Sequence, residues 1–155
     1  MIHIGTFDGD RNHLLPLFAL ADDAPAQIAQ YLTTGVVLVA RNDDDIVGHV
    51  QVVETDDARV CEIKSLAVPE AHQGTGIGTR LVHAAIACCV ARSADSVIVS
   101  TATADIENLR FYQRCGFRME RIVRDAFGSH SGYADDAMVD GIPLRDQVYF
   151  RLDLR

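Results

Sequence analysis

Runs of alternating or continuously apolar residues mark the strands of this chain. Seven such runs are expected to be strands, at 2–7, 36–41, 46–55, 59–68, 96–103, 117–126 and 146–154. The polar sequence NDDD separates the second run from the third, which predicts an antiparallel hairpin that the fourth run continues. The fifth run, SVIVSTAT, is almost continuously apolar, as is typical of a strand buried on both faces.

Helical periodicity fills the segments between several of these strands. Apolar residues at helical spacing predict helices at 11–22, 24–33, 77–92 and 106–115. Pro25 suits a first helical turn, and Gly116 suits a C-terminal cap. The third helix joins strands 59–68 and 96–102, and such a crossover makes that pair parallel. A loop at 127–144, rich in Gly, Ser, Asp and Pro, is expected before the last strand.

These elements predict an α/β (α+β) fold in one domain spanning residues 1–155. Its centre would be a mixed, mostly antiparallel sheet of about seven strands that contains one parallel pair and carries helices on both faces. A chain of 155 residues is long enough to bury a single core. The four cysteines show no C-x-x-C spacing, and we expect them to pack as small apolar side chains rather than to form disulfides or bind a metal.

The charge balance narrows the choice of partners. There are 14 basic and 22 acidic residues, and the formal charge of −8 repels nucleic acid and anionic lipid. An anionic cofactor could still bind, because a local array of backbone N–H groups acts at short range. The chain has no run of 18 apolar residues and no signal-peptide pattern, so we expect a soluble cytoplasmic protein without a membrane or nucleic-acid partner.

Three alternate glycines, Gly74, Gly76 and Gly78, stand at the start of the helix expected at 77–92. Glycine permits positive φ and close approach of a ligand, and the start of a helix presents unpaired N–H groups that bind phosphate. The loop is not a dinucleotide fingerprint, because Thr79 occupies the position of the third glycine, and it lacks the Gly-Lys-Ser/Thr of a Walker loop. A tight turn with no ligand is the alternative for the glycines alone.

A longer pattern favours a specific phosphate ligand. The arrangement Gln73-x-x-Gly76-x-Gly78, between a strand and an amphipathic helix, resembles the acetyl-CoA loop Q/R-x-x-G-x-G/A of the GCN5-related N-acetyltransferase (GNAT) superfamily. Further along, ENLRFYQRCGF resembles that superfamily's N-x-x-x-x-Y-x-x-x-G-F region, in a form with Asn108 four residues before Tyr112. Spacing of i,i+4 places these two residues on one helix face. The resemblance is clear over 36–126 and looser at both ends.

The resemblance implies that the parallel strands splay to form a V-shaped cleft for acetyl-CoA. The backbone at 66–68 would pair with the pantetheine amides, the N–H groups of 74–79 would hold the pyrophosphate, and Asn108 would contact the pantetheine arm. The implied cofactor-binding residues are Leu66, Ala67, Val68, Gln73, Gly74, Thr75, Gly76, Ile77, Gly78, Thr79, Asn108 and Tyr112. This chemistry requires no metal.

Acetyl transfer to an amine needs two proton events, because the ammonium must lose a proton and the departing thiolate must gain one or be stabilised. Tyr112, with a reference pKa of about 10, suits the second role as a neutral phenol near the thioester sulfur. Glu62 is the candidate base, since it occupies the place of the base glutamate in the histone acetyltransferase branch of the superfamily. The alternatives for Glu62 are a structural pairing with Lys64, or with a cation on a neighbouring strand, and a water chain that acts as the base.

The resemblance therefore implies an N-acetyltransferase that moves acetyl from acetyl-CoA to a primary amine, by direct transfer in a ternary complex. We expect a small-molecule acceptor, with a protein or peptide acceptor, or a noncatalytic acyl-CoA sensor, as alternatives. Whether the chain forms a homodimer is left open. Several carboxylates near the expected cleft would either attract a cationic acceptor or serve solubility alone. They are Asp22, Asp23, Asp135, Asp136 and Asp140.

Overall fold

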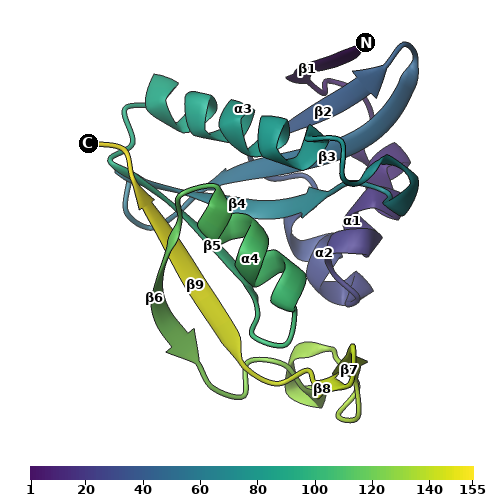
Figure 1. The fold of residues 1–155 in the computed structure, drawn as a ribbon, viewed down its shortest axis with the longest axis vertical. Helices are drawn as coiled ribbons and strands as arrows, with labels where there is room; N and C mark the ends of the chain where they lie inside the picture. The colour runs from purple at the N-terminus through teal and green to yellow at the C-terminus, as the bar shows by residue number, and fades with distance from the viewer.

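A computed structural model describes residues 1–155 and contains the expected succession of strands and helices (Figure 1). The helices are α1 (Leu15–Ala21), α2 (Pro25–Tyr31), α3 (Ile77–Ala91) and α4 (Ile106–Arg114). The strands of the main sheet are β1 (Ile2–Thr6), β2 (Val36–Asn42), β3 (Asp45–Glu54), β4 (Val60–Ala67), β5 (Ser96–Ala102), β6 (Arg118–Val123) and β9 (Gln147–Asp153). No helix is long and apolar enough to span a bilayer.

The parallel pair stands at the centre of the sheet. The strand order is β1-β2-β3-β4-β5-β9-β6, and only β4 and β5 run parallel. This arrangement confirms the predicted mixed sheet. The two central strands pair over 60–63 and 96–99 only, although β4 continues to Ala67 and β5 to Ala102. Beyond Ile63 the strands therefore separate, and the sheet opens as a V.

Helices cover the sheet on both faces, as predicted. In Figure 1, α3 and α4 lie in front of the sheet and α1 and α2 lie behind it. The core between the sheet and the front helices includes Leu81, Val82, Ala85, Tyr112 and Phe150. The smaller core under α1 and α2 includes Leu14, Phe18, Ile28, Val37 and Val39. All four cysteines are free thiols, and Cys61 and Cys89 are buried.

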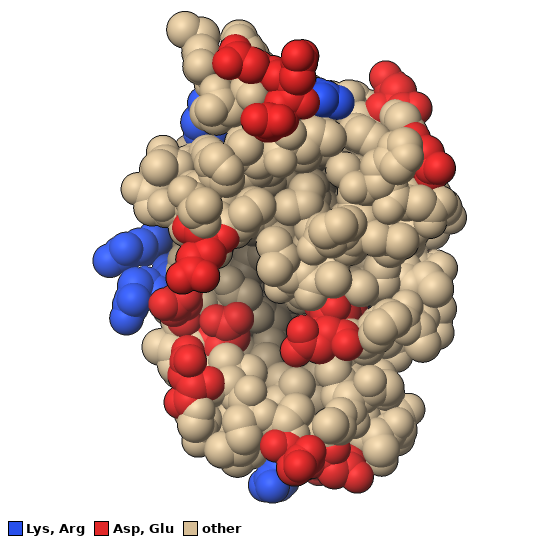
Figure 2. Space-filling model, turned by 90° about the vertical axis from the view of Figure 1, so that its right-hand side faces the viewer, with Lys and Arg blue, Asp and Glu red and all other residues tan.

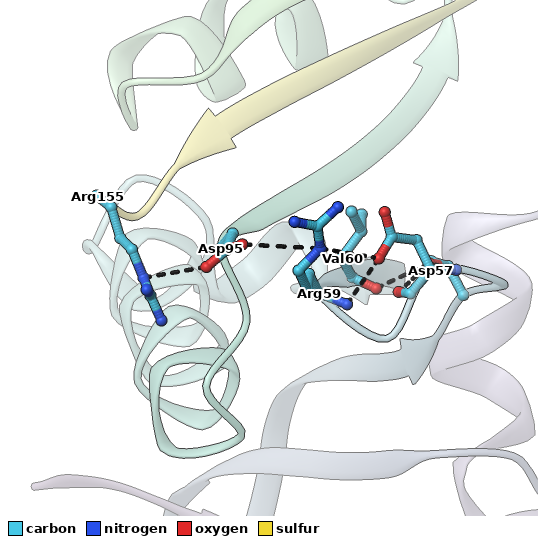
Figure 3. Close-up of polar contacts among 6 residues, drawn as sticks. Asp57, Arg59, Val60, Asp95 and Arg155 are labelled. Carbon is cyan, nitrogen blue, oxygen red and sulfur yellow. Dashed lines mark hydrogen bonds and ion pairs between the residues drawn. The ribbon is translucent and has the colours of Figure 1, made fainter.

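The closed end of the V is held by contacts between strand ends (Figure 3). The carboxylate of Asp95, just before β5, lies 3.9 Å from Nε of Arg59 and 3.0 Å from Nε of Arg155. These ion pairs are solvent-exposed and contribute less than about 1 kcal/mol each. The main chain adds bonds in which Asp95 N donates to Arg59 O at 2.7 Å and Leu154 N donates to Asp95 O at 2.8 Å. The backbone therefore does most to hold the starts of β4 and β5 together at the closed end.

Two segments differ from the sequence-based expectation. The helix expected at 11–22 is a 3₁₀ turn at Arg11–Leu14 followed by α1, because Pro16 has no N–H with which to continue an α-helical ladder from Asn12. The loop expected at 127–144 contains a 3₁₀ turn (Ser129–Ser131) and a short hairpin of β7 (Met138–Val139) and β8 (Ile142–Pro143). The remaining element boundaries shift by only a few residues.

Candidate active site

The open part of the V begins at a β-bulge in β4. Gln51 of β3 pairs with Ser65, but the next residue, Val52, pairs with Ile63, so Lys64 has no partner on β3. Such a bulge bends the strand locally, and this one lies where β4 leaves β5. The edge of β4 that faces the V has no strand partner from here to its end at Ala67. An extended ligand could pair with this edge as an added strand.

The glycine loop at the mouth of the V has the geometry of a phosphate cradle. Gly74 and Gly76 adopt φ of +76° and +85°, and a Cβ on either would meet nothing within 4 Å. Gly76 is the N-cap of α3, and none of the backbone N–H groups of residues 74–79 donates a hydrogen bond within the chain. These donors converge at the positive end of the α3 dipole, which favours an anion.

Side chains on both sides of the loop hold it in place. Gln73 Nε2 donates to the Val68 carbonyl at 2.8 Å, and Thr75 Oγ1 donates to the His72 carbonyl at 2.7 Å. The Gln73 side chain therefore fastens the loop to the end of β4. Gly78 faces α4 so closely that a Cβ would lie 3.3 Å from the ring of Phe111. The first turn of α3 thus meets the second turn of α4 beside the V.

Asn108 and Tyr112 both face the sheet from α4. The Asp105 side chain caps the helix by accepting from Asn108 N at 3.1 Å, and Asn108 Nδ2 donates to Thr101 Oγ1 on β5 at 3.1 Å. The Tyr112 side chain is buried and packs against aromatic rings at centroid distances of 5.1 to 5.9 Å. These rings belong to Phe111, Phe117 and Phe150.

The Tyr112 hydroxyl makes no hydrogen bond within the chain, yet it is not among the fully enclosed polar atoms. Its oxygen therefore reaches accessible surface. Burial raises the pKa of this phenol well above its ordinary value, and the neighbouring Cys115 and Asp105 add to the rise. The group is consequently neutral at physiological pH and can donate a hydrogen bond.

Glu62 lies on the opposite face of the sheet, in a cavity of about 550 Å³ beside the end of α2. The cavity is lined by Tyr31, Thr34, Gly35, Val36, Val53, Glu54, Glu62, Lys64 and Arg92. Burial raises the pKa of the Glu62 carboxyl, while the charges of Lys64 and Arg121 oppose that rise. A carboxylate with a raised pKa is better matched to accept a proton from an ammonium group.

Sequence reasoning did not identify Tyr31 and Tyr133, whose hydroxyls both bind Asp22 on this face of the sheet. Asp22 accepts hydrogen bonds from the hydroxyls of Tyr31 at 2.9 Å and Tyr133 at 2.6 Å, and from Ala24 N at 3.0 Å. Gln27 Nε2 also donates to the Ser131 carbonyl at 3.0 Å. The loop at 127–144 is therefore fastened to α1 and α2. The Asp22 carboxylate is occupied by these donors, so it is not a free attractant for an acceptor.

Other carboxylates surround an opening on this side of the molecule. Figure 2 views the protein from the right of Figure 1 and shows a hollow with Asp and Glu side chains around it. Lys and Arg side chains lie at the margins of this view. A cationic group is therefore attracted towards the hollow, in keeping with the chain's net charge of −8.

A buried amide holds the turn that borders the Glu62 cavity. Gln51 Nε2 donates to the carbonyls of Tyr31 at 2.7 Å and Thr34 at 2.9 Å, and its side chain is fully buried. Gly35, in the same turn, approaches β3 so closely that a Cβ would lie 2.1 Å from the Val52 carbonyl oxygen. Arg11 adds bonds to this turn from the outside.

Replacing Gln51 by leucine is expected to lower the free energy of unfolding by about 1–3 kcal/mol, because two hydrogen bonds of about 0.5–1.5 kcal/mol each are lost, although both carbonyls keep another donor. Urea denaturation of the wild type and the variant measures this difference. Gln30→Leu, on the exposed side of α2, is the matched control and should unfold with the wild type. Equal stability of the two variants would show that the Gln51 amide does not hold the turn.

The sequence of the chain matches the model of one protein family. The family model described as "Acetyltransferase (GNAT) family" matches residues 11–117. The chain belongs to this family. The GNAT resemblance drawn from the loop and from α4 is thereby confirmed, and the protein is an acetyl-CoA-dependent N-acetyltransferase of the GNAT type.

Individual relatives agree with this assignment. The uncharacterized N-acetyltransferase YvbK of Bacillus subtilis is 35% identical over 143 residues, covering 92% of this chain and 90% of YvbK. A Bacillus subtilis acetyltransferase crystallised in complex with CoA is 32% identical with a TM-score of 0.90, and the match covers 100% of both chains. A GNAT family acetyltransferase from Elizabethkingia anophelis with acetyl-CoA bound is 27% identical with a TM-score of 0.90, covering 99% of this chain and 98% of the other.

Proposed function

We propose that this GNAT enzyme transfers acetyl from acetyl-CoA to the primary amine of a small molecule, by direct transfer in a ternary complex. The observation that carries the proposal is the placement of the two candidate catalytic residues on opposite faces of the sheet. Tyr112 packs on the α3 and α4 side, and Glu62 lies in the cavity on the α2 side. The V between β4 and β5 is the opening through which donor and acceptor could meet.

The donor side fits coenzyme A by its chemistry. The N–H groups of 74–79 would receive the pyrophosphate, and the unpaired edge of β4 at 66–68 would pair with the pantetheine amides. Asn108, already held towards the sheet by Thr101, would contact the same arm. Coenzyme A or acetyl-CoA is present in the solved structures of two relatives, which supports this use of the cleft.

The residues then divide the two proton transfers between them. Glu62 accepts a proton from the acceptor's ammonium group, which leaves a free amine to form the new C–N bond to the acetyl carbon as the C–S bond breaks. The Tyr112 hydroxyl donates its hydrogen bond, and then its proton, to the departing thiolate. Once the C–N bond forms, the nitrogen releases its second proton to solvent, and solvent also takes the proton held by Glu62 and returns one to the phenol. The balance is one amide, one thiol and one released proton from one ammonium and one thioester.

The acceptor side favours a small molecule. The loop at 127–144 is tied to α1 and α2 through Tyr133 with Asp22 and through Ser131 with Gln27, so it restricts that side of the molecule. The cavity that contains Glu62, at about 550 Å³, is within the usual range for small-molecule sites. A peptide acceptor would need a longer open groove across these contacts.

The test is an amine library assayed with acetyl-CoA for released thiol, with mass spectrometry of the products. The library contains amino acids, polyamines, aminosugars and lysine-containing peptides. Acetylation of one or more small amines, with little or no reaction of the peptides, is the expected result. Efficient acetylation of peptides alone would overturn the small-molecule assignment.

Glu62→Gln is expected to lower kcat/KM most at neutral pH, where the acceptor is protonated and needs a base, by about 10²-fold on the scale typical of general bases. The deficit should shrink as the pH rises and free amine becomes abundant. The Glu62 pKa is raised in the fold. As the pH is lowered, the wild-type enzyme should therefore lose activity by protonation of this base at a higher pH than an enzyme with an ordinary glutamate would. Rates of both enzymes across pH 5–10 measure these effects. Overlapping pH profiles would show that the base is another group or water.

The same variant gives an independent stability readout. A raised folded-state pKa means that the folded protein binds this proton more tightly than the unfolded chain does. The stability contributed by Glu62 is therefore lost as pH rises through the folded pKa, and the ionised group costs stability at neutral pH. Glu62→Gln should accordingly melt at or above the wild-type temperature, so its loss of rate would not reflect unfolding.

A further inference from the structure

We propose that Lys64 and Arg121 form a binding site for an anionic group of the acceptor, so that the enzyme selects amines that also carry a carboxylate or a phosphate. This inference rests on the proposed acetylation of a small amine near Glu62. It concerns a part of the acceptor that does not react. Lys64 lines the cavity that contains Glu62. Arg121 shares the sheet face of Glu62 by register, because Glu62 lies opposite Ile98, Ile98 opposite Arg151, and Tyr149, two residues before Arg151, opposite Arg121. Both charges oppose the rise in the Glu62 pKa.

Lys64 is the single lysine of the chain and occupies the bulge of β4. Its Nζ lies 5.1 Å from the centroid of the Tyr31 ring, and it lines the cavity that contains Glu62. No ion pair of the chain includes Lys64, and its side chain is exposed. The ring holds the ammonium in place by a cation–π contact without neutralising it.

Arg121 reaches the same face from β6. Its guanidinium lies 3.9 Å from the centroid of the Tyr149 ring on β9, and it too is absent from every ion pair. Other arginines around this face are paired with carboxylates: Arg151 with Glu120 and Asp153, and Arg92 with Glu54. Lys64 and Arg121 are thus each held against an aromatic ring, and their charges are not neutralised by a carboxylate.

Two cations without an ion-pair partner point to an anionic ligand in a chain of net charge −8. The general field repels an anionic acceptor, so recognition of one would require local positive charge beside the base. An amine bearing a carboxylate or phosphate a few bonds away would place its ammonium at Glu62 and its anion at Lys64 and Arg121. The guanidinium fork can donate two parallel hydrogen bonds to such an anion.

The alternative is that the two cations only keep Glu62 ionised. The two explanations differ in selectivity. If they act on Glu62, removing a cation changes the pH profile equally for every amine. If they also bind the acceptor, removing a cation raises KM for anionic amines beyond any change shared with neutral amines.

The experiment uses amines matched in structure and differing in the anion. The pairs are L-leucine with isoamylamine, L-phenylalanine with phenethylamine, and O-phosphoethanolamine with ethanolamine. The wild type should show at least about tenfold higher kcat/KM for the anionic member of one or more pairs, the effect of one charge-assisted hydrogen bond. Preference within the amino-acid pairs identifies a carboxylate, and preference within the ethanolamine pair identifies a phosphate.

Variants then assign the preference to residues. Lys64→Met and Arg121→Met should each reduce this preference by about tenfold through KM for the anionic amine, because any effect exerted through Glu62 is shared by both members of a pair and cancels in their ratio. Lys64→Arg keeps the charge and should retain most of the preference. Arg114→Met, on the exposed side of α4, removes a cation from the other face of the sheet and should change nothing.

Three results would overturn the proposal. The first is a wild type that uses both members of every pair equally well. The second is a parallel loss for anionic and neutral amines in the Lys64 and Arg121 variants, which would assign the cations to Glu62 instead. In both cases acetyl transfer itself stands. The third is acetyl-CoA binding with no amine acetylated, which would remove the proposed acetylation of small amines together with the anion site.

Discussion

Replacing Gly76 by valine is expected to weaken acetyl-CoA and CoA binding by at least about tenfold, the cost of losing one charge-assisted hydrogen bond. Gly76 adopts φ of +85° at the N-cap of α3, a conformation that a β-branched residue resists. Relief of that strain would turn the loop and misalign the N–H groups of 74–79. Titration calorimetry with each ligand measures the change in Kd.

The chain offers a matched control for the backbone strain. Gly141 has φ of +83°, and a Cβ there would meet nothing within 4 Å, as at Gly76, but it lies in the turn between β7 and β8. Gly141→Val should lose a similar amount of stability and keep its affinity for acetyl-CoA. Unchanged affinity in a folded Gly76 variant, or equal weakening in both variants, would remove the loop from the cofactor site.

Local signals in the sequence were sufficient for most of the fold. The apolar periods located every strand of the main sheet, and Gly116, at φ of +96°, follows the end of α4 as a cap residue should. These signals are local because each depends on a few neighbouring residues. The helix expected at 11–22 was too long for the same reason, since periodicity counts apolar positions and does not register the missing N–H of Pro16.

Contacts between distant segments could not be predicted in this way. The bond from Tyr133 to Asp22 joins residues 111 positions apart, and no local pattern marks it. The short hairpin of β7 and β8 has strands of two residues each, which is too brief for an alternation to be recognised. The absence of an ion pair at Lys64 and at Arg121 likewise depends on which carboxylates the fold brings near them.

The bulge in β4 also limits what spacing alone can say about the site. Glu62 and Leu66 are four residues apart, and regular alternation would place them on one face. The bulge at Lys64 breaks that alternation, so Glu62 lies in the cavity beside α2 while Leu66 packs against the core on the side of α3. The two proposed sides of the V, for donor and acceptor, therefore depend on this one inserted residue. The family resemblance pointed to Glu62, but only the register shows on which face of the sheet it lies.

The environment of Tyr112 differs from that of the hydrogen-bonded tyrosines of this chain. A tyrosine kept for stability usually gives its hydroxyl a hydrogen-bond partner when buried. Tyr31 and Tyr133 follow that rule, because both donate to Asp22. The Tyr112 ring is only 5% exposed, yet its hydroxyl has no partner in the chain. The ring is thus fixed by packing while its O–H remains available to a ligand.

Replacing Tyr112 by phenylalanine is therefore expected to lower kcat by about 10²-fold, on the scale typical of a general acid, with little change in acetyl-CoA affinity. Stability should stay close to the wild type, because the ring and its contacts with Phe117 and Phe150 are kept and no hydrogen bond is lost. Tyr133→Phe is the contrasting control, since it breaks the bond to Asp22 and should lower the melting temperature while retaining most of kcat. Steady-state kinetics on an amine from the library, with thermal melting of both variants, separates these patterns. Normal turnover in the Tyr112 variant would show that the departing thiolate takes its proton from another group or from water.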